Sequence, residues 1–420
     1  MPKIVLISVL LTILISCLSF LLWLAHDVSF FNIAENFQEN GSQKPSILHL
    51  HIVSGFGGGE NHSLTLYKLL QSAGYTSLMV IQENSPMRAE LDRLKLPYAT
   101  TRVSIIKCIP LLFRFVLGYQ LENIFEHHHF DIIQCNTERE VSAAKQIASF
   151  HKAKIVFFRH LRSPLNNTQT INNIDGVVAV SDAIKQNIEQ IITKQHYTTK
   201  NVVFIAPFFK QEPFLNFTPV ILDRKDFFKA RFGLDITDAP ILCMIANTSP
   251  RLDYKNYPLL LHAVARLVHE KKIPVQVIAV GQGTGKATLE VMSKKLHVDH
   301  CVHFVGFSQE VPEILYHSDI FVLTSNWEAF GIVYLEAGLM KKPSVGAYQT
   351  GAQDSIVDGK TGFLFKNNDC DDLVAKLEFL IKKPQLQTHM GEKAYEHIST
   401  HFLNEHKFEQ LETLYQKILT

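Results

Sequence analysis

Cysteine pairs and a strong net charge are both missing from this sequence. Its six cysteines contain no Cys-x-x-Cys pair, and their spacing fits neither a disulfide framework nor a zinc site. Lysines and arginines number 41 and aspartates and glutamates 40, so the formal net charge is +1. Because nucleic-acid-binding proteins usually carry a basic excess, this balance argues against nucleic acid as a partner. The cysteine pattern favours a reduced, cytosolic setting.

Low-complexity tracts and internal repeats are also missing. Apolar residues make up 46% of the 420 residues and charged ones 19%, so nothing suggests global disorder. A chain of this length is too long for one ordinary core and fits two domains of about 150–200 residues each.

One stretch near the N-terminus has no charged residue. Residues 4–24 are mostly Leu, Ile, Val and Phe, and a helix of that length spans a hydrocarbon core of about 30 Å. We therefore predict a transmembrane anchor at residues 1–26. Two alternatives remain. One is a lipoprotein signal, because residues 14–17 resemble a lipobox, and the other is a cleaved signal peptide. Against both, the apolar run continues past Cys17 without a small-x-small cleavage site.

Short apolar strands alternate with helical segments after a polar tether at residues 27–45. The alternation in residues 46–206 predicts a parallel sheet covered on both faces. Residues 207–222 contain several prolines and phenylalanines with little periodicity and are the predicted linker. The pattern restarts in residues 223–388 and ends in a helical region at 389–420. The sequence thus predicts two α/β domains with a cleft between them.

The segment Ser325–Ala337 carries the strongest chemical signal. Two carboxylates, Glu328 and Glu336, flank a Phe330-Gly331 turn between a predicted strand and a predicted helix. Backbone N–H groups at such a helix start suit a phosphate, and glycine lets the backbone approach a ligand closely. Glu336, about one turn into the helix, can accept hydrogen bonds from ribose hydroxyls. Glu328 lies where a transferred sugar would be held.

This segment resembles the E-x7-E motif of the retaining GT-B glycosyltransferases, the family-4-like and group 1 glycosyl transferases. Residues 342–345 are similar to the family's G-x-P-V strand entry, and residues 354–364 are similar to its E-x-I-x-D-G-x-x-G-x-L run. The resemblance covers about residues 46–415. The donor contacts that it implies in this segment are Phe330, Gly331, Ile332, Val333 and Glu336.

A second motif supplies two cations. Arg251 and Lys255 lie between a predicted strand and a helix and resemble the family's R-L-x-x-x-K element, whose side chains hold the donor diphosphate. Glycosyl transfer puts negative charge on the departing phosphate, and two fixed cations offset it. Their separation is one residue shorter than in the commonest form, so Lys255 is the firmer prediction. The resemblance implies Arg251, Lys255 and Glu328 as catalytic and donor-binding residues.

The first half of the chain offers two further matches. The Gly57-Gly58-Gly59-Glu60 run resembles the family's G-G-x-E loop, so Gly57 and Gly58 are predicted donor contacts; an ordinary strand–helix turn is the alternative. His160 ends a strand where the family often has a histidine facing the reaction centre. It is the predicted catalytic residue on the acceptor side, and a structural role is the alternative. Residues 206–209 depart from the family's N-G-V-D.

Three patterns are weaker. Gly281-Gln-Gly283 after a strand fits any nucleotide-binding α/β fold or a tight turn. The consecutive histidines 127–129 cannot easily converge on one ion, so we predict no metal site. Residues 105–121 fit either a membrane-facing basic amphipathic helix or a core helix.

The resemblance implies a GT-B fold, in which two Rossmann-like α/β domains flank a cleft and the C-terminal helical region packs back toward the first. It implies a hexosyltransferase-type enzyme with a nucleotide-diphosphate sugar as donor and a hydroxyl acceptor that is lipid-linked or a glycan. Retention, no bound metal and no cofactor are expected. A sugar-nucleotide epimerase, a phosphorylase or a non-catalytic membrane-tethered sugar-nucleotide-binding subunit remain alternatives.

Two arguments about membrane sidedness conflict. Lys3 precedes the apolar stretch while Asp27, Glu35 and Glu39 follow it, which favours an external catalytic domain. Sugar nucleotides, however, are made mainly in the cytosol, and the cysteines show no disulfide pattern. We predict a membrane protein with a single N-terminal anchor and a cytoplasmic catalytic domain.

Overall fold

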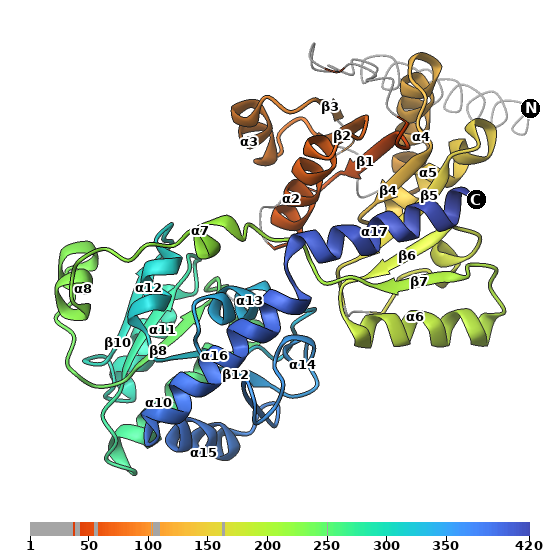
Figure 1. The fold of residues 1–420 in the computed structure, drawn as a ribbon. Coiled ribbons are helices and arrows are strands. Elements are labelled where there is room, and N and C mark those ends of the chain that lie inside the picture. Colours follow the sequence, from red (N-terminus) through yellow and green to blue (C-terminus); the bar gives the residue numbers. More distant parts are fainter. Residues whose placement is uncertain are drawn as a thin grey trace, which may run out of the picture. The chain divides into compact units, whose positions relative to one another are not determined.

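The computed structural model describes residue 37 and residues 43–53, 58–101, 103, 110–161, 164–249 and 251–420. Within these ranges the chain forms two compact units, each built on a parallel sheet (Figure 1). The predicted anchor at 1–26 and most of the tether at 27–45 lie outside the described residues. Among the helices that are described, none has the length and apolar character needed to cross a membrane.

The first unit comprises the described residues up to Val180 together with Ile184–Phe208 and Gln410–Thr420. Its seven-stranded sheet has the order β3-β2-β1-β4-β5-β6-β7, and every residue of β1 to β4 is buried. Burial on both faces explains why apolar residues predominate in these strands without a strict polar alternation. The strands are β1 (Ile47–His51), β2 (Ser77–Gln82), β3 (Tyr98–Thr101), β4 (Ile132–Cys135), β5 (Lys154–Arg159), β6 (Gly176–Ala179) and β7 (Asn201–Phe204). The helices of this half of the chain are α2 (Gly58–Ser72), α3 (Met87–Leu94), α4 (Pro110–His127), α5 (Glu138–His151), η2 (Thr168–Ile171) and α6 (Asp182–Gln195).

The second unit comprises Ser181–Ala183 and Phe209–Glu409. Its six-stranded parallel sheet has the order β10-β9-β8-β11-β12-β13. The strands are β8 (Ile241–Ile245), β9 (Gln276–Val280), β10 (Val302–Gly306), β11 (Ile320–Leu323), β12 (Ser344–Ala347) and β13 (Gly362–Phe365). The helices are α7 (Glu212–Leu215), α8 (Arg224–Phe232), α9 (Leu252–Lys255), α10 (Tyr257–His269), α11 (Lys286–Lys295), α12 (Val311–His317), α13 (Ile332–Leu339), α14 (Ala352–Ser355), α15 (Cys370–Ile381) and α16 (Pro384–His401).

An aspartate ties the two central strands together at the amino-terminal edge of each sheet. Asp131, just before β4, accepts hydrogen bonds from the backbone N and the Oγ of Ser46, at 2.7 and 2.8 Å. Asp319, just before β11, accepts from the backbone N of Ile241 at 2.7 Å and pairs with Arg224 at 2.8 and 3.0 Å. These bonds hold the register of β1 against β4 and of β8 against β11. These two aspartates therefore leave the carboxyl-terminal edge of each sheet available to other side chains.

The C-terminal helices divide between the two units. Helix α16 packs on α13 in the second unit, whereas the end of α17 (Asn404–Leu419) belongs to the first. There the buried Tyr415 accepts a hydrogen bond from Gln134, and Tyr75 donates to Glu412 at 2.8 Å. The helical region expected at 389–420 is therefore not one body, because its residues up to Glu409 stay with the second unit. The chain first passes from the first unit to the main segment of the second after Phe208, inside the expected linker at 207–222.

Candidate active site

The donor residues expected in the second unit follow the carboxyl ends of β8 and β11. These two strands are neighbours, and the strand order reverses between them. In open parallel α/β sheets, ligands bind beyond the carboxyl ends of the strands at such a switch point. The chain leaves β8 through Arg251 to α9, and it leaves β11 through Glu328 to α13. The fold therefore brings two motifs that are distant in sequence to adjacent strand ends.

Lys255 and Glu328 form an ion pair at this switch point. Lys255 Nζ lies 2.7 Å from Glu328 Oε2, and the two side chains are only 22% and 13% exposed. Thr324 Oγ1, directly after β11, lies within donor distance of the backbone oxygens of Lys255 and Asn256, at 3.2 and 2.9 Å. A partly buried pair interacts more strongly than one in bulk water, and the threonine fixes its backbone. The cation is thus held in place before any ligand is present.

Asn256 connects three loops around this pair. Its backbone is left-handed, with φ 49° and ψ 44°, a conformation that asparagine tolerates better than most residues. Its Nδ2 donates to Oδ1 of Asn326 at 3.0 Å and to Oδ1 of Asn368 at 2.9 Å. Asn326 in turn donates its backbone N–H to the Tyr254 carbonyl at 3.1 Å. The loops after β8, β11 and β13 are therefore linked through asparagine side chains.

Two glycines shape the start of α13. Gly331 precedes the helix with φ 87°, and a Cβ there would lie 2.7 Å from the Tyr334 ring and 3.2 Å from Glu328 Cγ. Gly351 donates its N–H to the Glu328 carbonyl at 2.9 Å, and a Cβ there would lie 2.3 Å from Phe330 Cα. Conformation and space both require glycine at position 331, and space alone requires it at position 351. Phe330 is buried, while Ile332 and Val333 at the helix start are partly exposed.

Glu336 stands on α13 without a partner among the described residues. Its side chain is partly buried, and this burial raises its pKa from the ordinary value of 4.5 to about 7. Burial disfavours the charged carboxylate because no hydrogen-bond donor or cation replaces the lost water. A hydroxyl-bearing ligand would supply such donors. The geometry of Glu336 therefore fits a carboxylate that is completed by a ligand.

Arg251 is placed differently from Lys255. Its side chain is exposed, and within the described ranges no carboxylate pairs with its guanidinium. Its backbone carbonyl accepts a hydrogen bond from the Tyr254 N–H at 3.2 Å, which starts α9. The structure thus brings Lys255 and Glu328 together and leaves Arg251 free to approach a ligand from solvent.

Histidines gather at the carboxyl ends of β1 and β5 in the first unit. His49 and His51 lie on β1, His62 on α2, and His160 directly after β5. The His62 and His160 ring centroids are 4.6 Å apart, and His160 Nε2 lies 3.0 Å from Asn136 Oδ1. His160 is thus part of a cluster. Gly57 lies outside the described residues, and Gly58 is the first residue of α2.

Burial keeps three histidines of this cluster neutral. Together with the contribution of neighbouring histidines at His49 and His160, it lowers the pKa of His49 to about 3, of His51 to about 4 and of His160 to about 3. His51 Nε2 also lies 3.9 Å from Glu60 Oε1. A histidine with such a pKa carries no charge at pH 7 and serves as a hydrogen-bonding group.

Glu140 holds the loop ends beneath these histidines. The buried carboxylate accepts backbone hydrogen bonds from Ile52 at 2.7 Å, Asn136 at 2.6 Å and Thr137 at 2.9 Å. Burial raises its pKa to about 7, although these donors act in the opposite direction. Thr137 and Glu140 also form a capping box at the start of α5. One side chain therefore ties the ends of β1 and β4 together.

Sequence reasoning missed five residues that build these two sites. Two of them had a readable signal. The Thr137-x-x-Glu140 spacing is a capping box, and Asn136 directly follows the apolar strand β4, at the edge where ligands bind. The partners of the other three lie far away in sequence, so no local pattern identifies them. The missed residues are Asn136, Glu140, Asn256, Thr324 and Gly351.

No metal-binding group of three or more His, Cys, Asp or Glu side chains occurs in the described ranges. His127 Nδ1 contacts the Asn123 carbonyl at 2.9 Å, while His129 Nε2 lies 3.1 Å from Asp131. His127 and His129 thus contact different partners.

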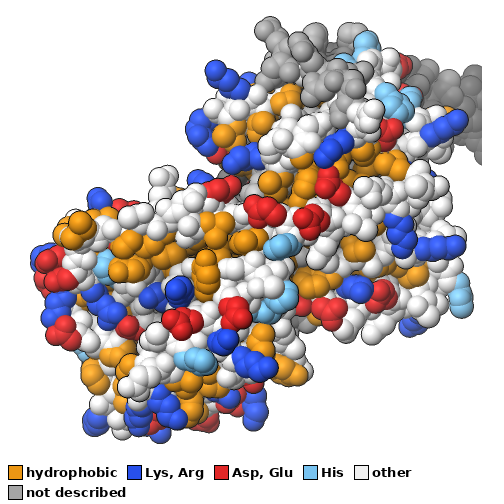
Figure 2. Space-filling view, viewed as in Figure 1, with side chains coloured by type: hydrophobic (Ala, Val, Ile, Leu, Met, Phe, Trp, Pro, Cys, Tyr) orange, Lys and Arg blue, Asp and Glu red, His pale blue; other side chains and the backbone are white. Residues whose placement is uncertain are grey.

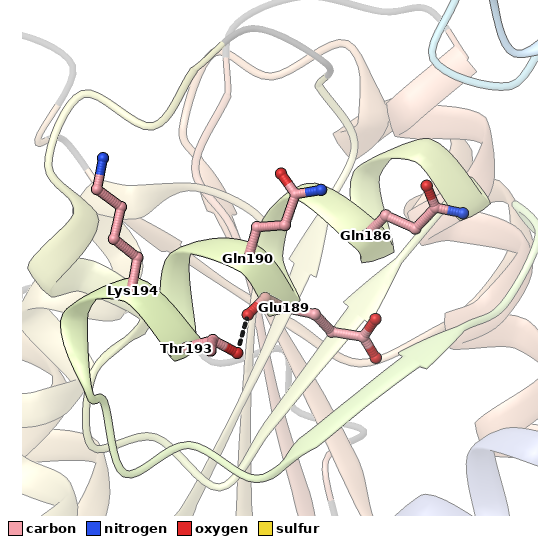
Figure 3. Close-up of a pocket in the computed structure, with 5 residues that line it drawn as sticks. All are labelled: Gln186, Glu189, Gln190, Thr193 and Lys194. Carbon is pink, nitrogen blue, oxygen red and sulfur yellow. Dashed lines mark hydrogen bonds between the residues drawn. The ribbon is translucent and has the colours of Figure 1, made fainter.

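One hollow of about 560 Å³ on the first half of the chain runs along α6 (Figure 3). Its side chains come from a single polar helix, and none is a predicted site residue: Gln186, Glu189, Gln190, Thr193 and Lys194.

Surface charge does not indicate a further binding site on the face seen in Figure 2. Positive and negative side chains are interspersed over both units there. The described residues form no broad field of one sign on this face, in keeping with the net charge of +1.

Two family models match most of the chain. "Glycosyltransferase Family 4" matches residues 56–197, and "Glycosyl transferases group 1" matches residues 226–397. The chain belongs to the family-4-like GT-B glycosyltransferases. The family predicted from the sequence is confirmed, and the second model includes Lys255, Glu328 and Glu336 of this glycosyltransferase.

Curated relatives of this glycosyltransferase match over part of their length. The N-acetyl-alpha-D-glucosaminyl L-malate synthase of Bacillus anthracis is 28% identical over 251 residues, which are 59% of this chain and 61% of the relative. The GDP-mannose-dependent alpha-(1-6)-phosphatidylinositol monomannoside mannosyltransferase of Mycolicibacterium smegmatis is 30% identical over 173 residues, 39% of this chain and 44% of the relative. The chain thus spans about three fifths of the first relative and less than half of the second.

Solved structures share the fold of this glycosyltransferase. A glycosyltransferase from Rickettsia africae superposes with a TM-score of 0.77 at 18% identity and covers 90% of this chain and all of its own. HepE of Anabaena, solved with UDP, gives 0.72 at 21% identity, with 88% of this chain and all of its own covered. At such identities the likeness concerns the fold alone. It confirms the predicted pair of Rossmann-like α/β domains of the GT-B kind.

The raised pKa of Glu336 predicts a pH-dependent effect of Glu336→Gln. Below the unfolded value of 4.5 the carboxyl group is neutral in both states and costs nothing extra; as the pH rises toward 7, ionisation favours the unfolded chain. The variant should therefore gain stability over the parent between about pH 5 and pH 8, by roughly 1–3 kcal/mol. Urea denaturation, monitored by hydrogen exchange of α13 peptides, measures this difference in the free energy of unfolding between variant and parent.

Glu290→Gln is the matched control for this measurement. Glu290 lies in the same unit, is 48% exposed and pairs with Lys286 one turn away. Its substitution should leave the stability difference nearly constant over the same pH range, because an exposed pair contributes little. A Glu336→Gln difference that is equally independent of pH would show that this carboxylate is not desolvated.

Proposed function

We propose that this glycosyltransferase moves a sugar from a nucleotide-diphosphate donor to a hydroxyl of a lipid-linked or glycan acceptor, with retention and without a metal ion. The observation that carries the proposal is the arrangement at the switch point of the second sheet. A partly buried cation, Lys255, and an unpartnered carboxylate, Glu336, lie on the two segments that follow β8 and β11. A nucleotide-diphosphate sugar needs both, because it presents phosphates and a ribose diol together.

The start of α13 supports the diphosphate site. Gly331 brings no side chain of its own to the residue before the helix, and the Gly351 N–H holds the turn through its bond to the Glu328 carbonyl. A diphosphate there would accept these hydrogen bonds and meet the positive end of the helix dipole. Glu336 on the same helix would then accept hydrogen bonds from the ribose hydroxyls.

Lys255 would change its partner when the donor binds. The diphosphate brings more negative charge than Glu328, so the lysine ammonium group would turn to the phosphate, and Arg251 would join it from solvent. Glu328 would then be released to accept hydrogen bonds from hydroxyls of the transferred sugar. The cation thus remains paired throughout, which avoids leaving a partly buried charge alone.

The reaction step would use the departing phosphate as the base. The bond between the anomeric carbon and the phosphate oxygen breaks, and the acceptor oxygen bonds to that carbon on the same face. The acceptor proton passes to the phosphate oxygen that leaves. Lys255 and Arg251 stabilise the negative charge that grows on this phosphate in the transition state.

The relatives support the donor more closely than the acceptor. HepE of Anabaena was solved with UDP and with UDP-glucose. The curated relatives include an N-acetyl-alpha-D-glucosaminyl L-malate synthase, a phosphatidylinositol monomannoside mannosyltransferase and a poly(ribitol-phosphate) alpha-N-acetylglucosaminyltransferase. These acceptors share only a hydroxyl group, so the proposal for this chain is limited to that chemistry and its glycan or lipid carriers.

A donor panel tests the proposal directly. Purified protein is incubated with UDP-, GDP-, ADP- and TDP-hexoses, with and without a lipid extract from membranes, and free nucleotide is measured. We expect nucleotide release from one donor class that increases with a suitable acceptor, and a product whose anomeric proton coupling matches that of the donor. A donor that binds and is never consumed would indicate a binding subunit, and an inverted product would contradict retention.

Lys255→Ala should lower kcat about 10²–10³-fold while the protein remains folded. The charge that Lys255 meets grows as the phosphate departs, so its loss acts on the transition state more than on the bound donor. Steady-state nucleotide release with the preferred donor measures this effect. Lys229→Ala is the control, because Lys229 is an exposed cation of the same unit paired with Asp235. A Lys255→Ala enzyme with an unchanged kcat and only a raised KM would contradict the leaving-group role.

Activity should survive chelation by EDTA. The chain supplies its own cations for the leaving phosphate, and its Asp-x-Asp pattern at residues 369–371 has other roles. Asp369 caps α15 by accepting from the Asp372 N–H at 2.9 Å, and Asp371 pairs with Arg266 at 2.6 Å. Nucleotide release is compared before and after EDTA. A loss of activity that Mg²⁺ or Mn²⁺ restores would show that a metal takes part.

A further inference from the structure

Asn136 is the central hydrogen-bonding residue of the histidine cluster in the first unit. Its Nδ2 donates to the Leu50 carbonyl at 2.7 Å and lies 3.3 Å from His49 Nε2. Its Oδ1 lies 3.0 Å from His160 Nε2 and accepts from Ser63 Oγ at 3.4 Å. The amide therefore contacts β1, α2 and the end of β5 at once.

The Leu50 carbonyl decides which way this amide faces. A carbonyl oxygen only accepts, so the amide nitrogen of Asn136 must face it, and the amide oxygen must face His160. That oxygen carries no hydrogen, so His160 Nε2 must be the donor of the 3.0 Å bond. The neutral ring of His160 then has its proton on Nε2 and a bare lone pair on Nδ1.

The position of Asn136 is itself fixed from the backbone side. Its N–H donates to the buried Glu140 Oε2 at 2.6 Å, and Glu140 also binds the Ile52 and Thr137 N–H groups. These bonds hold the backbone of Asn136 in place, and its amide cannot turn away from His160 without giving up the bond to the Leu50 carbonyl. His160 itself is partly exposed, and in the described part of the chain no hydrogen bond reaches its Nδ1.

We propose that Asn136 is a positioning residue that holds His160 as the Nε2–H tautomer, so that its Nδ1 accepts a hydrogen bond from a substrate hydroxyl. The proposal rests on the function proposed above for the substrate and on the geometry of the first unit for the tautomer. A bare Nδ1 accepts from O–H groups and repels phosphate or carboxylate oxygens, which also only accept. The site around His160 would therefore select sugar hydroxyls.

A neutral acceptor suits the reaction for a second reason. The sugar ring gains positive charge as the bond to the leaving phosphate breaks, as in other glycosyl transfers. A protonated histidine beside that ring would oppose this charge, whereas a neutral one does not. Burial among His51 and Arg159 lowers the pKa of His160 to about 3, which keeps the ring neutral at the pH of the reaction.

Nitrogen NMR of the whole protein with ¹⁵N-labelled histidine tests the tautomer without any substrate. His160 is assigned by the signals that disappear in His160→Gln. We expect Nε2 to show the shift of a protonated nitrogen and Nδ1 that of a bare one, both unchanged between about pH 5 and pH 8. A proton on Nδ1 of His160 in the parent protein would overturn the proposal, whatever the variants do.

Asn136→Ala then tests whether Asn136 is the cause. Loss of the amide oxygen should let His160 exchange between tautomers, so that its two nitrogen shifts move toward each other. In Asn136→Asp one oxygen remains, so the Nε2 proton should stay and the added negative charge should raise the pKa of His160. Shifts in Asn136→Ala that equal those of the parent would assign the tautomer to something other than Asn136.

Asn201→Ala is the matched control. Asn201 is a partly buried asparagine at the start of β7 in the same sheet, and its Nδ2 donates to the Asp175 carbonyl at 2.8 Å, much as Asn136 does to Leu50. Its loss should leave the His160 shifts in place. If they move as far as in Asn136→Ala, the effect comes from loosening the sheet and the proposal fails.

Kinetics connect the tautomer to the reaction. Asn136→Ala should lower kcat about tenfold, the effect of one hydrogen bond, and Asn136→Asp should recover part of it. The affinity for free nucleotide should not change, because the groups proposed to bind it lie in the second unit. An unchanged kcat in Asn136→Ala would refute the substrate contact. If no donor is consumed by the parent protein, the function proposed above fails, and the NMR result still decides the tautomer.

Discussion

All strands of both sheets run parallel, and this constraint decides where the polar chemistry can lie. Each strand must be followed by a crossover that returns the chain to the starting edge, so the carboxyl ends and the helix starts that follow them share one edge of each sheet. Helix N-termini make that edge favourable for anions. Asp131 and Asp319 lie at the opposite edge, where they fix strand pairing. In the second unit, Asp319 is therefore separated from the predicted site carboxylates Glu328 and Glu336 by the length of a strand.

The charged groups at the functional edge are kept close to neutral. Lys255 is offset by Glu328, burial raises the pKa of Glu336 and Glu140 to about 7, and His160 is uncharged. The carboxyl-terminal edge of each sheet, taken by itself, thus carries little net charge at these groups, and in the second unit the cation is already paired. The ion pair with Glu328 thus offsets the cost of partly burying the Lys255 charge before a ligand binds.

Local patterns in the sequence were sufficient for the fold and for the position of the motifs. The strand predicted before the Phe330-Gly331 turn is β11, and the helix predicted after it is α13, because apolar runs and glycine turns act over a few residues. The family followed from motif spacing. The pair between Lys255 and Glu328 could not be derived in this way, since it joins residues 73 positions apart. The roles of the predicted site residues remain predictions.

The same limit explains what was missed in the first half of the chain. His160 was singled out as one residue at a strand end, but its partner Asn136 follows a different strand. Which two side chains meet there depends on strand order and register, which are set by packing across the whole sheet. The division of the helical region at Glu409 has a similar origin, because it depends on which sheet offers Tyr415 a buried place.

The return of the chain to the first unit has a consequence for biosynthesis. Leu411, Leu414, Tyr415 and Ile418 are buried in that unit, yet the ribosome adds them only after it has made all of Phe209–Glu409. Domains generally fold as units during translation, with the N-terminal one first. Here the apolar surface of the first unit that these four residues cover stays exposed until the second unit has been synthesised. The order in which the two cores can be completed is thus the reverse of their order along the gene.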